Sequence, residues 1–144
     1  MKRFVPHGKR KLTNDKGQSM VEMALVLPIV VLILLGVIQF GIVFFCHVNV
    51  TAAAREGARM ASVGKTDAEI ITKIHYTLDT VTFLSRDSDP ERSVTITPSE
   101  DLRIPGDQIE VYVPALVDVV APLLGGQESI FPIAARASMR YQAE

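Results

Sequence analysis

A stretch of 32 consecutive positions without a charged residue constrains this chain more than any other feature. No Asp, Glu, Lys or Arg occurs between Glu22 and Arg55, and residues 24–45 are almost wholly apolar. About 20 such residues suffice for a helix that crosses a bilayer. A core helix of a soluble protein would show a polar face every 3.6 residues, and this segment shows none. We therefore expect a membrane-spanning helix at about residues 24–46, and the pattern excludes a soluble cytoplasmic enzyme.

Charge divides the chain at the start of this segment. Residues 1–17 carry six basic residues and one acidic residue, a net charge of +5. The other 127 residues carry nine basic and fifteen acidic residues, so the overall charge of −1 is the sum of two unlike parts. Because basic residues flanking a span stay in the cytoplasm, we expect a cytoplasmic N-terminus and an extracytoplasmic C-terminal part. Removal of the basic leader leaves no electrostatic footprint for nucleic-acid binding.

Three fates of the hydrophobic segment are compatible with its position near the N-terminus. It is a single-pass anchor, a removable secretory signal, or part of a precursor that is cut ahead of the segment. Ala52, Ala53 and Ala54 satisfy the A-x-A pattern of a signal peptidase site. However, a secretory signal has an apolar region of only about 7–15 residues. The greater length here favours retention in the membrane.

Glu22 places a carboxylate in the first turn of the apolar segment. An acidic residue at the centre of a membrane helix costs about 2.5–3.5 kcal/mol, and such residues are usually functional and have a partner. If the chain were cut after Gly17, Gln18 would become the first residue and Glu22 the fifth. The new amino terminus would then lie one helical turn from the carboxylate. Alternatively, Gly17 caps or interrupts the helix start, and Glu22 reaches the headgroups or is stabilised by the helix dipole.

Gly17 followed by Glu22, the fifth residue after it, resembles the processing site of type IV pilin-like precursors. Residues 19–28, 36–41 and 53–59 are similar to the TadE-like minor pilins (TadE and TadF) of bacterial Tad/Flp pili. Residues 106–113 and 135–140 show a weaker similarity to the same family. The family often has Phe after the glutamate, where this chain has Met23.

The resemblance implies that a membrane-embedded prepilin peptidase cuts between Gly17 and Gln18 at the bacterial inner membrane. It also implies that Glu22 is neutralised by the amino terminus of a neighbouring subunit during assembly. The chain would then be a minor pilin, or pseudopilin, required for adhesive Tad/Flp pili, and it would either stay in the inner membrane or be incorporated into the pilus. Its implied partners are the peptidase, other pilins and minor pilins, the inner-membrane assembly platform and membrane lipid. The alternative is an unprocessed single-pass envelope protein whose outer domain binds a partner.

Helical character continues beyond the apolar segment. Residues 48–63 contain many Ala and no Pro, and Gly64 supplies a C-terminal stop. A helix over residues 18–63 has 46 residues and is about 69 Å long. Pro28 should bend or loosen it. Ala53, Gly57 and Ala61 form a stripe of small residues that suits close packing, either on another helix or on the C-terminal domain of the same chain.

Residues 65–144 are predicted to form a small exported domain that follows the leader (1–17) and the long helix (18–64). Thr66 and Glu69 form a capping box, and the helical spacing of apolar residues continues to Leu84. Alternating patterns predict strands at about 93–97, 108–113 and 129–141, with an apolar connection of uncertain form at 115–124. The expected fold is α+β and pilin-like, with one helix against a three-stranded antiparallel sheet after the long N-terminal helix.

The sequence offers no recognisable catalytic or metal-binding set. His7, His47 and His75 are scattered among the leader, the edge of the apolar segment and the second helix. The lone Cys46 cannot form an internal disulfide, and it follows Phe45 rather than the small residue of a lipoprotein site. Arg55, Glu56 and Arg59 are most simply a solvated face of the helix. We expect no enzymatic activity, no cofactor and no metal ion.

Overall fold

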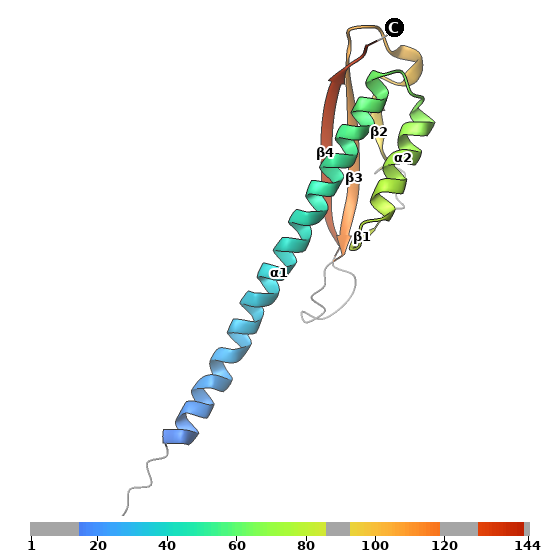
Figure 1. Cartoon of the computed structure of the whole chain (residues 1–144). Coiled ribbons are helices and arrows are strands. Elements are labelled where there is room, and N and C mark those ends of the chain that lie inside the picture. The colour runs from blue at the N-terminus through green and yellow to red at the C-terminus, as the bar shows by residue number, and fades with distance from the viewer. Residues whose placement is uncertain (1–14, 86–92, 119–129, 143–144) are drawn as a thin grey trace, which may run out of the picture. The chain divides into compact units, whose positions relative to one another are not determined.

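The computed structural model of the chain describes residues 15–85, 93–118 and 130–142. The chain divides into two units, Met1–Gly36 and Val37–Glu144, and the first helix contributes residues to both. Figure 1 shows the order of the elements along the chain. These elements are α1 (Asp15–Ser62), α2 (Asp67–Asp79), β1 (Leu84–Ser85), β2 (Thr95–Thr97), the short 3-10 helix η2 (Glu100–Leu102), β3 (Gln108–Asp118) and β4 (Ile130–Arg140).

Helix α1 is a single helix of 48 residues with Pro28 inside it. It begins three residues before the predicted start at Gln18 and ends at Ser62. Gly64 follows with a φ of +81°, a conformation that glycine adopts without steric cost. The amide of Lys65 donates to the carbonyl of Met60, and the amide of Gly64 donates to the carbonyl of Ala61, each at 3.1 Å. This pair of bonds is a Schellman motif, so the predicted stop at Gly64 is confirmed.

Helix α2 starts as predicted and ends earlier. The Thr66 hydroxyl accepts a hydrogen bond from the amide of Glu69 at 3.3 Å, which is the first half of the predicted capping box. The helix ends at Asp79, so the predicted extension to Leu84 is wrong. Three consecutive β-branched residues follow, at positions 80–82, and such residues lose side-chain freedom in a helix. Phe83 then adopts a φ of 71° and the chain enters β1.

Strand β3 is the centre of an antiparallel sheet. It pairs with β4 along one edge, while β2 and β1 pair with different parts of its other edge. The three predicted strands are confirmed, and the two-residue β1 is an addition that the sequence did not indicate. Strand β3 continues to Asp118, five residues beyond its predicted end at Val113. Residues 115–118 of the expected apolar connection are therefore strand, and residues 119–124 lie outside the described residues.

Strand β4 forms an edge of the sheet. Its eleven residues pair with β3 over the full length, from Gln108 opposite Arg140 to Asp118 opposite Ile130. Among the described strands, β4 pairs with β3 alone. Pro132 lies within β4, and proline has no amide hydrogen to donate to a neighbouring strand, so it is tolerated at such an edge.

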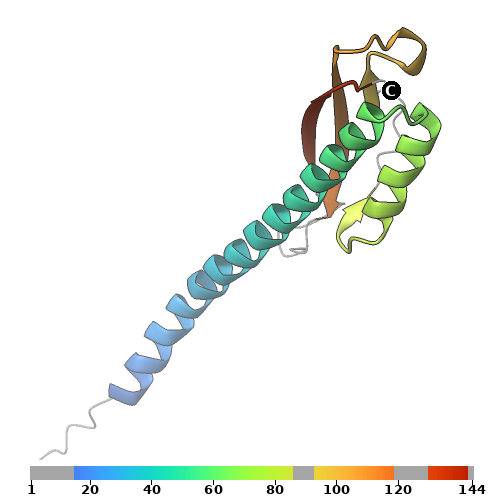
Figure 2. The ribbon, with the colours of Figure 1, turned by 45° about the horizontal axis from the view of Figure 1, so that its top comes forward.

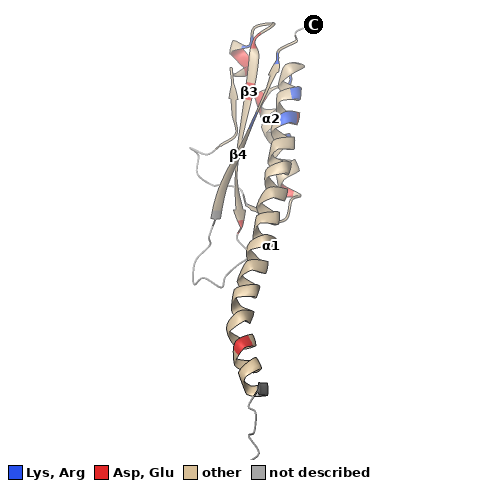
Figure 3. Cartoon of the chain, turned by 90° about the vertical axis from the view of Figure 1, so that its left-hand side faces the viewer, with Lys and Arg blue, Asp and Glu red and all other residues tan. Residues whose placement is uncertain are grey.

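One face of β3 forms the floor of the hydrophobic core. Residues in β3 alternate between buried and partly exposed positions, as the predicted alternation requires. Helices α1 and α2 cover this face side by side (Figure 2), and the side view shows the sheet on one side and both helices on the other (Figure 3). The buried core comprises Val50, Ala53, Ala54, Ala58 and Ala61 of α1, Ile70, Ile74 and Leu78 of α2, and Ile109, Val111, Val113, Ala115 and Ala135 of the sheet.

Gly57 lies at the closest approach between α1 and this core. A Cβ atom added there would lie 2.8 Å from Cδ1 of Ile74 and 3.3 Å from Cγ1 of Val111. It would also lie 3.4 Å from Cγ2 of Ile70. The absence of a side chain at Gly57 therefore permits α1 to touch both α2 and β3 at one point.

A buried arginine joins the turn between α1 and α2 to the connection between β2 and β3. The side chain of Arg103 is 3% exposed and forms an ion pair with Asp67. Its guanidinium also donates to the carbonyl of Lys65 at 2.9 Å. Asp67 and Glu100 each accept a hydrogen bond from the other's backbone amide at 3.1 Å. These contacts fix the end of the domain at which α1 terminates.

We expect Gly57→Val to lower the free energy of unfolding of the domain by about 1–3 kcal/mol, because added volume in a packed core forces side chains or backbone to shift. Denaturant unfolding of the full chain in detergent micelles measures this, with tyrosine fluorescence as the signal. Gly41→Val is the matched control, since a Cβ at Gly41 meets nothing within 4 Å. Equal effects of the two substitutions would contradict the assigned packing.

We expect Arg103→Met to lower the free energy of unfolding of the domain by about 3 kcal/mol, because it leaves the Asp67 carboxylate partly buried without its cation. The control is Arg136→Met, which breaks an ion pair with Glu110 whose side chains are 70% and 46% exposed. Exposed pairs contribute at most about 1 kcal/mol. The same unfolding measurement compares the two variants, and a larger loss from Arg136→Met would show that the buried pair is not the stronger contact.

Candidate functional site

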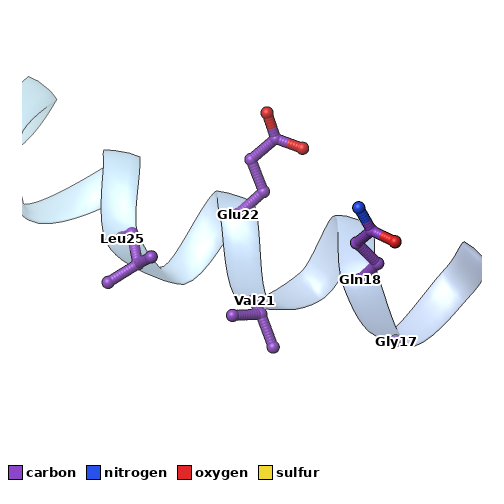
Figure 4. A pocket seen from close by; sticks show the side chains of 5 residues that line it. All are labelled: Gly17, Gln18, Val21, Glu22 and Leu25. Atoms are coloured by element: carbon purple, nitrogen blue, oxygen red, sulfur yellow. The ribbon is translucent and has the colours of Figure 1, made fainter.

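The predicted processing site lies within the first turns of α1. Gly17 neither caps nor interrupts the helix, which begins at Asp15 and continues through it. The side chains of Gln18, Val21, Glu22 and Leu25 lie on one face of the helix, with Gln18 and Glu22 toward one edge of that face and Val21 and Leu25 toward the other (Figure 4). Together with Gly17, these four residues line an open hollow on the surface. Glu22 lies four positions after Gln18, which corresponds to a rise of about 6 Å along the helix axis.

Glu22 is an exposed carboxylate among exposed apolar side chains. Its neighbours Met20, Val21 and Met23 are 77%, 62% and 66% exposed. In the described part of the chain, no ion pair involves Glu22. Along α1 beyond Glu22 no charged residue occurs before Arg55, and Figure 3 shows this uncharged length of helix.

Most large apolar side chains in the apolar part of α1 are exposed. Those that are exposed between Met20 and Phe45 keep from 40% of their surface, at Val31, to 77%, at Met20, whereas Leu35, Ile42 and Val43 are half-buried. A core helix of a soluble protein would bury such a surface. Within the described residues, one helix is long and apolar enough to cross a membrane, and it covers Gly17–Ser62. This length and composition fit a single-pass membrane protein.

The stripe of small residues lies inside the domain. Ala53 is 2% exposed, Ala61 is fully buried, and Gly57 lies against Ile70, Ile74 and Val111. The sequence is compatible with two partners for the stripe, a second helix or the chain's own C-terminal domain. The structure shows the stripe packed on the chain's own α2 and β3.

Arg55, Glu56 and Arg59 lie on the solvent side of the domain half of α1. Arg59 donates two hydrogen bonds to the Glu56 carboxylate, at 2.9 and 2.7 Å. These bonds hold the pKa of the Glu56 carboxyl below its usual value, and the same contact raises the pKa of Arg59. Because the two side chains remain 41% and 58% exposed, the pair contributes little to stability. This arrangement is the solvated charged face that the sequence indicates.

Two features of the structure had no clear signal in the sequence. Arg103 stands in a loop between two prolines, and only the fold brings it to Asp67, 36 residues earlier. Phe83 was assigned to a helix and instead occupies a turn at positive φ. Within residues 15–85, 93–118 and 130–142, no group of three or more His, Cys, Asp or Glu side chains is placed to hold a metal ion.

Together these features define a class of protein with one exposed apolar N-terminal helix joined to a small α+β domain. Comparison with protein families then identifies the relatives of that helix. Residues 17–59 match the family model described as TadE-like protein, so the predicted resemblance to the TadE-like family is confirmed over the helix. This match suggests a protein associated with the Tad pilus. Neither a curated protein nor a solved structure matches the chain.

The match begins at Gly17 and ends at Arg59. It therefore contains the Gly17–Gln18 junction, Glu22, the apolar segment and the part of α1 that packs on the domain. The weaker similarity at residues 106–113 and 135–140 lies outside the matched range.

Proposed function

We propose that this chain is a minor pilin, or pseudopilin, that acts in the assembly of a Tad/Flp-type pilus after a prepilin peptidase cuts it behind Gly17. One observation carries the proposal. Glu22 is an exposed carboxylate one turn beyond the Gly17–Gln18 junction, at the start of an apolar helix that matches the TadE-like family. The +5 leader would remain in the cytoplasm, and the domain would face outward from the bacterial inner membrane.

Cleavage requires the first turns of α1 to open. The Gly17–Gln18 bond is helical in the uncut chain, whereas a protease site takes an extended backbone. Glycine within a helix is less favourable than alanine by about 1 kcal/mol, so Gly17 lowers the cost of this opening. Its lack of a side chain also removes an obstruction at the bond to be cut.

Assembly contacts would be made by the apolar part of α1. The helix face at Ala53, Gly57 and Ala61 is already occupied by α2 and β3. The exposed hydrophobic side chains from Met20 to Phe45 are free of this packing. We therefore assign the lipid contacts, and the contacts with other pilins and with the assembly platform, to that part of the helix. The Glu22 carboxylate would pair there with the amino terminus of a neighbouring subunit.

Processing is tested by the N-terminal residue of the membrane-extracted protein. We expect a mature chain that begins at Gln18, and we expect Gly17→Val to leave the leader attached because it adds a branched side chain at the cut. Gly36→Val is the control, since a Cβ at Gly36 meets nothing within 4 Å. Intact mass distinguishes the forms. A wild-type chain that keeps its leader in cells with active prepilin peptidase favours the alternative, an unprocessed envelope protein.

Glu22 is tested separately from cleavage. We expect Glu22→Ala to leave membrane insertion intact and to reduce the number of assembled pili, because the neighbouring amino terminus loses its carboxylate. The matched control is Glu56→Ala on the same helix, which removes only an exposed pair with Arg59. Sheared fibres are quantified against the membrane-bound protein. Unchanged piliation in Glu22→Ala would remove the pairing role.

A further inference from the structure

The folded domain extends along α1 to the outer end of the apolar segment. Cys46, the last residue of the predicted span, is fully buried, although its neighbours Phe45 and Val48 are 53% and 52% exposed. One face of the helix is therefore covered by protein at a position where lipid was expected on all sides. The unit that contains this domain begins at Val37, within the same segment.

The register of the sheet places one end of it beside the last residues of the apolar segment. Gly57 lies against Val111, and β3 continues for seven residues to Asp118, about 24 Å. The same distance along α1 is about 16 residues, which leads back from Gly57 to about Gly41, five residues before Cys46. Strand β3 runs opposite to α1, because Gln142, just beyond β4, donates to the carbonyl of Ser62 at 2.9 Å.

Two aromatic side chains are exposed at this end of the sheet, which we call the base. Phe131 pairs in register with Val117 and is 55% exposed. Phe83 is 40% exposed, and its carbonyl accepts a hydrogen bond from the amide of Asp118 at 3.0 Å. On α1, Phe44 and Phe45 are also exposed. At the opposite end of the sheet, the exposed apolar residues include Leu102 and Ile104, which are aliphatic.

The backbone at Phe83 has a conformation that phenylalanine does not prefer. Its φ of 71° lies in the left-handed region, which a bulky residue rarely adopts. Glycine would adopt it without steric cost. Strained positions of this kind cluster where the surrounding structure or a bound partner requires them. Here the strained residue exposes a phenylalanine at the level at which the apolar helix segment ends.

We propose that the base of the sheet contacts the bilayer, with Phe83 and Phe131 in the boundary between the headgroups and the acyl chains. The occupant of this surface is lipid, because the same unit also exposes Phe44 and Phe45 at the end of the predicted span. Segments that lie on a membrane surface bury apolar side chains, phenylalanine among them, at this boundary. Asp79 and Asp118 belong to the same end and limit the depth, because acidic side chains are costly in the hydrocarbon core. The proposal requires insertion of α1 but neither cleavage nor pilus assembly.

The chain contains no tryptophan, so a single introduced tryptophan reports on its own surroundings. We expect Phe131→Trp, in the full chain reconstituted into phosphatidylethanolamine–phosphatidylcholine vesicles, to show blue-shifted emission. Lipids brominated near the headgroup should reduce this emission more than lipids brominated deep in the acyl chain. Flotation of the vesicles confirms that the chain is inserted.

Leu102→Trp is the matched control, because Leu102 is 68% exposed and lies at the opposite end of the domain. Its emission should remain unquenched. Phe83→Trp gives an independent measurement if Phe131→Trp does not fold. Three outcomes overturn the proposal: no quenching at the base, equal quenching at Leu102→Trp, or stronger quenching by the deep bromine. A chain that does not float with the vesicles overturns it as well, together with the assignment of α1 as an anchor.

Discussion

The contact of α1 with α2 and β3 at Gly57 is the constraint on which the rest of the structure depends. A Cβ atom at this point would lie 2.8 Å from the Ile74 side chain and 3.3 Å from that of Val111, so a side chain there would displace its neighbours. The adjacent alanines extend the same close approach toward either end of the interface. The core is therefore incomplete without α1, which contributes five of its buried residues. One helix thus supplies both the membrane-compatible surface and the wall of the domain.

This double use of α1 explains how its residues are distributed. Large apolar side chains occupy the segment that remains exposed, and small ones occupy the part against the sheet. A small-residue stripe on a membrane helix usually indicates contact with another helix. Here it contacts the chain's own domain, so the proposed contacts with other subunits are assigned to the N-terminal part of the helix. Glu22 stands in that part, near the junction at which the leader would be removed.

The sequence predicted the elements that have strong local signals. The uncharged stretch after Glu22, the glycine stop at Gly64 and the alternation in β3 each follow from a repeating pattern or a backbone requirement. The continuation of β3 to Asp118 differs from the apolar connection expected at residues 115–124, because pairing with β4 and β1 extends the strand. In the structure Pro114 lies between the segments that pair with β2 and with β1, where neither of these strands needs its amide.

The remaining differences depend on contacts that are distant in the chain. Helix α2 was predicted to be too long because apolar spacing continues through Val81 and Leu84, whereas Leu84 pairs with Val117 as a strand residue. Arg103 gave no signal, since its partners lie more than 30 residues away. The relative placement of Gly17, Gln18 and Glu22 follows from helical spacing alone, because they lie within two turns of one helix. Their roles in processing and assembly stay predictions.

The edge strand β4 has a consequence for how the domain meets other chains. An exposed strand edge offers unpaired amides and carbonyls to any neighbouring chain, and it promotes uncontrolled sheet growth. Pro132 has no amide hydrogen, and the charged side chains of Arg136 and Arg140 are exposed along the same strand. Proline and charged residues on an edge strand disfavour pairing with a further strand. Strand β4 is therefore a poor template for sheet growth, although it is the edge of the described sheet.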